Sequence, residues 1–320
     1  MDKIGKYEVV RKIGEGGFGV VHEGWDPAIK RRVAIKTCTA QDEDRRKRFF
    51  REAEIAGNLQ HRHIVTVFDL GLQDGVPYLV QEYLSGEDLG EKLKRKEAIP
   101  DTVKLDYLIQ VAEGLEYAHS QNVVHRDIKP GNVRILQDGS VKIMDFGIAK
   151  LMDAEIQLTK TGMTVGTAAY LAPEQFEGRE VDLRADIFSY GVLAYELLSG
   201  KRPFRGKTFS AILFQIMTKD PEPLSLLWSR CPPRLSELVA KCLAKPPTRR
   251  YQSFTLLLAD LRPIREELGG GVTTAETATL RTDRPGEAPR RTLSFSRVLA
   301  AGLLVVALGL VARYAGRSTR

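Results

Sequence analysis

Three side chains with oxygen donors lie near the middle of the chain, at spacings that suit phosphate chemistry. Asp127 and Asn132 stand in "VVHRDIKPGNVRIL", and Asp145 follows in "VKIMDFGIAK". Each group borders a short apolar segment that is typical of a strand. Phosphoryl transfer from ATP needs a carboxylate that orients the attacking hydroxyl, and oxygen ligands for magnesium. Asp127 can act as that carboxylate, and Asn132 and Asp145 can hold the ion.

A lysine and a glutamate nearer the N-terminus form a second candidate group. Lys36 lies near the end of the β-branched segment "RRVAIKTC". In the following segment, "DEDRRKRFFREAEIAGNLQ", helical spacing places Phe49, Ala53 and Ala56 on one face, and Glu52 falls on that same face. A carboxylate on a core-facing stripe is costly unless it is paired, and Lys36 is the expected partner. The pair is either an ordinary structural ion pair or a phosphate-positioning pair, and the base and metal candidates favour the second interpretation.

A glycine cluster precedes both of these groups in the sequence. The segment "YEVVRKIGEGGFGVVHEGWD" alternates apolar and polar residues on both sides of Gly14-x-Gly16-x-x-Gly19-x-Val21. This pattern predicts two strands joined by a tight turn. Glycines allow backbone N–H groups to approach phosphate oxygens that a side chain would keep away. Taken alone, the cluster fits an ordinary glycine-containing hairpin equally well.

The order of these segments carries a resemblance. From "GEGGFGVV" through "VAIK", "HRDIKPGN" and "DFG" to "APE", the chain resembles eukaryotic-like Ser/Thr protein kinases of the bacterial membrane-anchored type, over about residues 5–265. The resemblance implies an α+β fold with two lobes. The small, β-rich N-lobe with one helix would cover about residues 1–84, and the larger, mainly helical C-lobe about residues 85–268.

The resemblance also implies an activity. The chain would transfer the γ-phosphoryl group of ATP to Ser/Thr hydroxyls of protein substrates, with Mg²⁺ as the cofactor and Mn²⁺ as an alternative ion. Lys129, two residues after Asp127, and the segment "GTAAYL" before "APE" resemble Ser/Thr kinases rather than tyrosine kinases. A membrane-tethered pseudokinase scaffold and a small-molecule phosphotransferase of related fold are the alternatives. The complete motif set speaks against the first, and "APE" with the preceding threonines speaks against the second.

Individual residues receive roles from the same resemblance. The implied catalytic residues are Asp127, Lys129 and Lys36, and the implied metal ligands are Asn132 and Asp145. The implied ATP contacts are Ile13, Gly14, Glu15, Gly16, Gly17, Phe18, Gly19, Val21, Ala34, Lys36, Glu52, Glu82, Leu84 and Asp88. Structural roles fall to Thr167, Asp186, His125 and a Glu174–Arg250 pair.

Three features of the sequence depart from the family pattern. Gly131 places no carboxylate beside Lys129, so a preference for basic residues in the substrate has no support. The pair Val133-Arg134 replaces two apolar residues. His63 replaces a smaller polar residue and is expected at the surface. The histidines other than His125 show no ligand spacing and are expected to be non-catalytic; they are His22, His61, His63 and His119.

The segment "LMDAEIQLTKTGMTVGT" has turn residues and no clear period, as is typical of a functional, mobile loop. Arg126, beside the predicted base, needs an anionic partner, and a phosphothreonine would supply one and order the loop. Thr159 and Thr161 resemble the paired phosphothreonines of bacterial membrane-anchored kinases, and Thr164 is a third candidate. We expect autophosphorylation at Thr161 or Thr159; the alternative is that all three are unmodified loop residues.

Charge and cysteine content exclude other classes. The net charge is +7, but residues 269–320 carry most of it as arginine, and residues 1–268 are nearly balanced. A nucleic-acid surface would require basic residues concentrated on the folded part, so no nucleic-acid partner is expected. The three cysteines, Cys38, Cys231 and Cys242, are widely spaced and predict neither a disulfide framework nor a zinc site. They are compatible with a reducing cytosol.

The last fifty residues predict a linker and an anchor. Residues 269–296 are rich in threonine, proline and arginine, and are expected to be a disordered juxtamembrane linker. Residues 298–312 are an unbroken apolar run, whose helix would reach about 22 Å against a hydrocarbon core of about 30 Å. With the flanking arginines directed outward, we expect one transmembrane helix at 297–316 and a short tail at 317–320. A core or interfacial helix is disfavoured, because the kinase fold is already complete and the run has no polar face.

ATP requires the kinase domain on the cytoplasmic side of the plasma membrane. Five arginines precede the run and three follow it, in modest agreement with the positive-inside rule. The expected partners are protein substrates, the membrane and a second copy for trans-autophosphorylation. Gly302 and Gly309 share a helix face that would allow such pairing.

Overall fold

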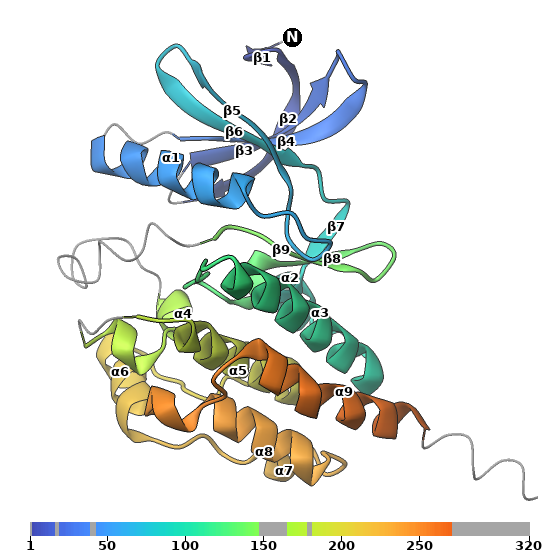
Figure 1. The fold of residues 1–320 in the computed structure, drawn as a ribbon, viewed down its shortest axis with the longest axis vertical. Helices are drawn as coiled ribbons and strands as arrows, with labels where there is room; N and C mark the ends of the chain where they lie inside the picture. The colour runs from blue at the N-terminus through green and yellow to red at the C-terminus, as the bar shows by residue number, and fades with distance from the viewer. Residues whose placement is uncertain (1, 17–18, 39–42, 147–164, 178–180, 271–320) are drawn as a thin grey trace, which may run out of the picture. The chain divides into compact units, whose positions relative to one another are not determined.

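The computed structural model describes residues 2–16, 19–38, 43–146, 165–177 and 181–270. All of them belong to one unit, Met1–Gly271, while a second unit, Val272–Arg320, lies outside the described residues. Within the first unit, an antiparallel sheet with one helix forms a small lobe, and a mainly helical large lobe follows it (Figure 1).

The small lobe contains a six-stranded antiparallel sheet with the strand order β1-β2-β3-β4-β6-β5. Its strands are β1 (Lys3–Ile4), β2 (Tyr7–Gly16), β3 (Gly19–Asp26), β4 (Arg31–Thr37), β5 (Val67–Gln73) and β6 (Val76–Glu82). Because side chains alternate along a strand, β4 serves both faces of this sheet. Val33 and Ile35 pack with Tyr7 on one face, whereas Ala34 and Lys36 stand on the other.

Helix α1 (Glu43–Gly57) covers that second face (Figure 1). Phe49 and Ala53 of α1 pack against Leu79 of β6 and Cys38, which follows β4. The helical spacing that predicted a buried stripe on this segment is therefore what docks the helix beside Lys36.

The large lobe begins with a small antiparallel sheet of β7 (Gly86–Asp88), β8 (Val133–Leu136) and β9 (Val141–Ile143). Its helices are α2 (Leu89–Lys94), α3 (Asp101–Ser120), α4 (Val165–Ala168), α5 (Arg184–Ser199), α6 (Phe209–Thr218), α7 (Leu224–Leu227), α8 (Pro233–Cys242) and α9 (Phe254–Gly270). Short 3₁₀ turns occur at Pro130–Asn132, Pro173–Gln175 and Pro247–Arg249. Helix α5 is apolar around nearly its whole circumference and forms the centre of the lobe's core.

The predicted two-lobed α+β fold with one small-lobe helix is confirmed. Helix α9 continues to Gly270, beyond the residue where we placed the start of the linker. The rest of the predicted linker, the predicted transmembrane helix at 297–316 and the tail lie outside the described residues. No helix in the described segments combines the length and the apolar character that crossing a bilayer requires.

Candidate active site

Lys36 contacts one carboxylate from each lobe. Its Nζ lies 2.9 Å from Asp145 Oδ1 and 3.4 Å from Glu52 Oε1. Lys36 and Glu52 are both buried, on β4 and on the sheet-facing side of α1. Asp145 follows β9 in the large lobe, whereas Glu52 is carried by α1. The position of α1 therefore determines whether the Lys36 ammonium can contact both carboxylates.

The three charges shift one another's pKa values. Burial opposes the charged form of Lys36, but Asp145 and Glu52 outweigh it and raise the pKa of the ammonium. Lys36 lowers the pKa of Asp145, whereas burial raises the pKa of Glu52 to about 7. Asp145 lies closer to Lys36 than Glu52 does, so Glu52 is the group that loses its charge first as the pH falls.

A second group of polar side chains surrounds Asp127. Lys129 Nζ donates to Asp127 Oδ2 at 2.8 Å. Asn132 Nδ2 donates to the backbone oxygen of Asp127 at 2.8 Å and to its Oδ2 at 3.1 Å. The Met144 N–H donates to the backbone oxygen of Asn132 at 2.9 Å, which ties this loop to the residue before Asp145. The two predicted metal ligands therefore come from loops that are hydrogen-bonded to each other.

Asp186, a buried carboxylate on α5, binds the backbone just before Asp127. Asp186 accepts hydrogen bonds from the His125 and Arg126 N–H groups, each at 2.7 Å, and lies 2.8 Å from His119 Nε2. Burial alone would raise the pKa of Asp186, but the bond with His119 and the backbone donors lower it. His125 itself contacts Met144 O through Nε2 at 3.0 Å and packs against Phe146.

The sequence did not single out His119 as part of this arrangement. The signal was present, because Leu108, Ala112, Leu115 and His119 recur at helical spacing along the buried side of α3. A histidine on such a stripe needs a polar partner, and Asp186 is that partner.

Two residues of the site adopt a left-handed backbone without being glycine. Arg126 has φ of 67° and Asp145 has φ of 52°. Such conformations cost free energy and persist only where surrounding contacts enforce them. Arg126 is half-buried, its Nε has no hydrogen-bond partner among the described residues, and burial lowers its pKa.

The glycine cluster forms the turn end of the β2–β3 hairpin. Gly14 pairs with Val21, and Gly16 pairs with Gly19. Gly19 has φ of 142°, and a Cβ there would stand 1.7 Å from the carbonyl oxygen of Thr37, so this position accepts only glycine. Val21 is also the cross-strand neighbour of Lys36. Ile13 and Glu15 are exposed on β2, while Gly17 and Phe18 lie outside the described residues.

The segment between the lobes carries the other predicted ATP contacts. The Glu82 N–H donates to Thr66 O at 2.8 Å. The backbone carbonyl of Glu82 is therefore the group that can accept a hydrogen bond from the base of a nucleotide. The Glu82 carboxylate accepts from Lys142 Nζ at 2.9 Å. Leu84 is buried, and Asp88 accepts from the Glu91 N–H at the start of α2.

The residues with a predicted structural role all lie in the described region, whereas the predicted phosphorylation sites do not. Thr167 on α4 lines a cavity of about 440 Å³ together with Lys129 and Asp88. The Glu174 carboxylate receives two hydrogen bonds from Arg250, at 2.6 and 2.8 Å. Gly147 and the phosphorylation candidates Thr159, Thr161 and Thr164 lie outside the described residues.

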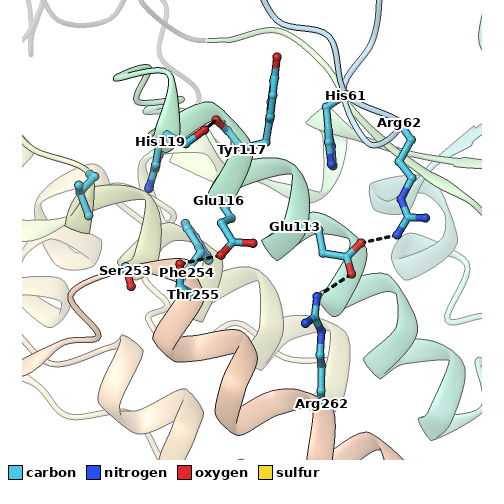
Figure 2. Close-up of a pocket in the computed structure, with 12 residues that line it drawn as sticks. His61, Arg62, Glu113, Glu116, Tyr117, His119, Ser253, Phe254, Thr255 and Arg262 are labelled. Carbon is cyan, nitrogen blue, oxygen red and sulfur yellow. Dashed lines mark hydrogen bonds and ion pairs between the residues drawn. The ribbon is translucent and has the colours of Figure 1, made fainter.

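The expectation that His63 lies at the surface is wrong. The side chain is buried, with Nδ1 at 3.0 Å from Val141 O and Nε2 at 3.2 Å from Glu113 Oε2. The segment after α1 passes against α3 and β9, so this position faces packed elements rather than solvent. Figure 2 shows the cavity beside it, about 730 Å³, where Glu113 also binds Arg62 and Arg262 at 2.9 and 3.0 Å.

The donor set fits a hard divalent cation. Because Asn132 commits its amide nitrogen to Asp127, its amide oxygen is the atom that can face an ion, and Asp145 supplies carboxylate oxygen. Magnesium commonly takes one or two protein oxygens and completes its shell with water and phosphate oxygens. No cluster of three or more His, Cys, Asp or Glu that could hold a metal by itself occurs among the residues that the structure describes.

Several known proteins are similar in sequence to this chain, and those named below are described as serine/threonine-protein kinases. The serine/threonine-protein kinase PknL of Mycobacterium bovis is 40% identical over 266 residues, which cover 82% of this chain and 66% of that protein. A probable serine/threonine-protein kinase of Clostridium acetobutylicum is 35% identical over 263 residues, or 81% of this chain and 40% of that protein. The probable serine/threonine-protein kinase PknB of Corynebacterium glutamicum is 35% identical over 301 residues, which cover 90% of this chain and 46% of that protein. The chain thus spans between 40% and 66% of the length of these relatives.

The family comparison covers most of the chain. The protein kinase domain matches residues 7–260, a range that includes Lys36, Glu52, Asp127, Asn132 and Asp145. Because this match extends over well more than half of the sequence, the chain belongs to the protein kinase domain family.

Proposed function

We propose that this chain is a Ser/Thr protein kinase that transfers the γ-phosphoryl group of ATP to protein hydroxyl groups. Protein kinase domains use ATP and a divalent cation, and the relatives named above are described as serine/threonine-protein kinases. The observation that carries the proposal is the joint geometry of Lys36 with Asp145 at 2.9 Å and Lys129 with Asp127 at 2.8 Å. Phosphoryl transfer requires positioning and charge stabilisation, and these pairs supply both.

Lys36 would hold the α- and β-phosphates, with Glu52 keeping the ammonium in place. The glycine turn between β2 and β3 would cover the phosphates with backbone N–H groups. Asn132 and Asp145 would hold the cation, which we take to be Mg²⁺ with Mn²⁺ as an alternative. When bound, that ion neutralises charge on the phosphate oxygens.

Asp127 would accept the proton of the substrate hydroxyl. The hydroxyl oxygen bonds to the γ-phosphorus while the bond from that phosphorus to the β–γ bridging oxygen breaks, and ADP leaves. Lys129, 2.8 Å from Asp127, would place positive charge beside the transferring group. Asp186 would act on this step only by positioning, because it holds the backbone of the residues before Asp127.

The activity test uses the full chain with labelled ATP, Mg²⁺ and a generic protein substrate. We expect phosphoserine and phosphothreonine in the substrate, and loss of labelling in Asp145→Asn. Arg234→Gln, in an exposed ion pair on α8, is the matched control and should label normally. Equal labelling by Asp145→Asn and the unmodified chain would refute the mechanism, and labelling by neither would favour the pseudokinase scaffold.

Activation would involve phosphate on Thr161 or Thr159, with Thr164 as a third candidate. Support comes from Arg126, whose guanidinium is half-buried beside Asp127 with an unpartnered Nε in the described part of the chain. A phosphate dianion would form charge-assisted hydrogen bonds with it. Mass mapping after incubation with Mg-ATP should find phosphate at one of these threonines. An active enzyme with all three unmodified would contradict this assignment.

Residues 297–316 would anchor the kinase domain to the plasma membrane from the cytoplasmic side. The apolar run and the excess of arginines before it support this arrangement. A second copy would then be the partner for trans-autophosphorylation. Protease added to sealed inside-out vesicles should digest residues 1–268, and their protection would overturn this topology. A phosphorylation rate that does not rise with chain concentration would overturn the dimer.

A further inference from the structure

The loop between α5 and α6 carries a concentration of cations. Residues 200–207 read "GKRPFRGK", with four basic side chains and no acidic one. Two contacts hold this loop on the large lobe. Phe204 is 1% exposed and stacks on Phe188 of α5, with ring centroids 6.0 Å apart, and the Arg205 N–H donates to Gln215 Oε1 of α6 at 2.8 Å. The cations therefore stand on a loop whose backbone is fixed.

This loop borders the proposed reaction centre. A cavity of about 440 Å³ is lined by Arg202 of the loop, by Thr167 of α4 and by Lys129, which donates to Asp127. Helix α4 packs against α6, the helix that follows the loop (Figure 1). A protein segment that presents its hydroxyl to Asp127 would therefore lie next to this cavity and to the cations beside it.

The carboxylate nearest to these cations is already bound. Glu196 of α5 also lines the cavity, and it accepts from Arg202 Nε at 3.2 Å and from the Tyr170 hydroxyl. The Glu196 side chain is 15% exposed, whereas that of Arg202 is 38% exposed. A substrate at this place would therefore meet the guanidinium of Arg202 rather than a free carboxylate.

Two further carboxylates line the same cavity from the opposite side. Asp88 accepts from the backbone N–H of Glu91, and the Glu91 carboxylate lies 2.7 Å from Lys94 Nζ. Each described carboxylate that lines the cavity thus already has a donor. Gly131, which also lines it, adds no charge beside Lys129.

A second cavity, of about 370 Å³, adjoins the first at Gly200 and Arg202. Lys201 and Arg205 line it as well, and both are exposed. None of the described residues that line this cavity is acidic. Cations on a rigid surface, with no carboxylate of their own chain between them, create a positive potential that attracts acidic groups.

We propose that Lys201, Arg202 and Arg205 form a subsite for acidic side chains of the protein substrate, so that the chain prefers Ser and Thr with aspartate or glutamate nearby. The inference rests on the proposed kinase function and names the substrate class of that same site. Arg202 has two effects, because it neutralises Glu196 and places a cation where the two cavities meet. Hydrogen bonds from these cations to a substrate carboxylate would be charge-assisted and therefore strong.

Two peptides that differ only in charge test this subsite. Each contains one threonine, flanked by glutamates in one peptide and by glutamines in the other. Initial rates with the full chain and Mg-ATP give the ratio of the two kcat/KM values, acidic over neutral. For the unmodified chain we expect a ratio of about ten, expressed mainly in KM because the carboxylates bind before transfer. In Lys201→Gln/Arg205→Gln the ratio should fall to about two, since each exposed charge pair contributes modestly.

Arg230→Gln/Arg234→Gln is the matched control, because it removes two exposed cations that line neither cavity. It should keep the ratio of the unmodified chain. Lys201→Glu/Arg205→Glu should reverse the preference toward the glutamine peptide. If a double variant does not fold, the single variants replace it, and each should carry part of the effect.

Two results would overturn the inference alone. One is equal kcat/KM for both peptides in the unmodified chain, and the other is a ratio that Lys201→Gln/Arg205→Gln leaves unchanged. No transfer to either peptide or to the generic protein substrate would instead overturn the proposed function, and this inference with it.

Discussion

The Glu174–Arg250 pair is buried within the large lobe and is fully hydrogen-bonded. The side chain of Arg250 is 0% exposed and that of Glu174 is 6% exposed. Besides its two bonds to the carboxylate, the guanidinium donates to the carbonyl oxygens of Ala244, Arg184 and Lys245 at 2.8, 2.9 and 2.9 Å. All five N–H groups of the guanidinium are therefore used, and only Glu174 carries a compensating charge among these partners.

Replacing Glu174 with glutamine should destabilise the chain strongly. The amide keeps the size of the side chain but removes the negative charge and turns an N–H₂ group toward a donor. Breaking a buried ion pair on one side leaves an uncompensated buried charge, which costs about 3–5 kcal/mol. The exposed pair Arg234–Glu267 gives the matched comparison, because its side chains are 56% and 58% exposed at a separation of 2.9 Å. Glu267→Gln should cost about 0–1 kcal/mol.

Urea titration of the full chain measures both effects. Trp228 packs against the large-lobe core, whereas Trp25 lies on β3, so a Trp25→Phe background makes fluorescence report on the large lobe. A Glu174→Gln loss no larger than that of Glu267→Gln would refute the reasoning. The double variant Glu174→Gln/Arg250→Met should lose less than the sum of the two single losses, because the unpaired charge is then gone.

Three further predictions concern the pH dependence of activity, the half-buried Lys245 and the glycine turn. The kcat/KM of the unmodified chain should fall below pH 7. Burial raises the pKa of Glu52 to about 7, so Glu52 then loses its charge and its ion pair with Lys36. Glu52→Gln should be weakly active, and its kcat/KM should not show this fall at acidic pH. Burial lowers the pKa of Lys245 to about 8, below its unfolded value, so the unfolded state binds more protons between about pH 8 and 10 and stability should rise across that window. Lys245→Met should be more stable at pH 7 and lack this rise in urea titrations, and an equal rise in both proteins would contradict it. Gly19→Ala should raise the KM for ATP by about tenfold in initial-rate assays, because the added Cβ meets a backbone oxygen, whereas Gly57→Ala, with open space around it, should leave the KM unchanged.

Much of the loop around Asp127 was predictable because its residues are close in sequence. Asp127, Lys129 and Asn132 lie within six positions, so the chain itself limits their separation, and a single turn brings them into hydrogen-bond contact. Helical spacing likewise predicted that Glu52 faces the sheet. The two-lobed fold was implied by the family resemblance that the motifs carry, and the family match over residues 7–260 supports that resemblance.

The environment of individual residues was harder to predict. His63 was expected at the surface, and only the packing of its segment against α3 and β9 buries it. His119 was set aside for lack of ligand spacing, yet it bonds to Asp186. Ligand spacing detects partners within one segment, and this partner comes from a different helix.

The sequence by itself determined which chemical groups are present, which of them share a turn or a helix face, and in what order the motifs occur. Only the tertiary structure decided which distant groups meet. Lys36 and Asp145 are 109 residues apart, and their 2.9 Å contact depends on how the small-lobe sheet and α1 sit over β9. Arg134 stands on the face of its sheet opposite the large-lobe core only because β8 lies between β7 and β9 and its neighbours Val133 and Ile135 are buried in that core. Local periodicity relates residues within one element, whereas sheet register and packing relate residues that no local pattern connects.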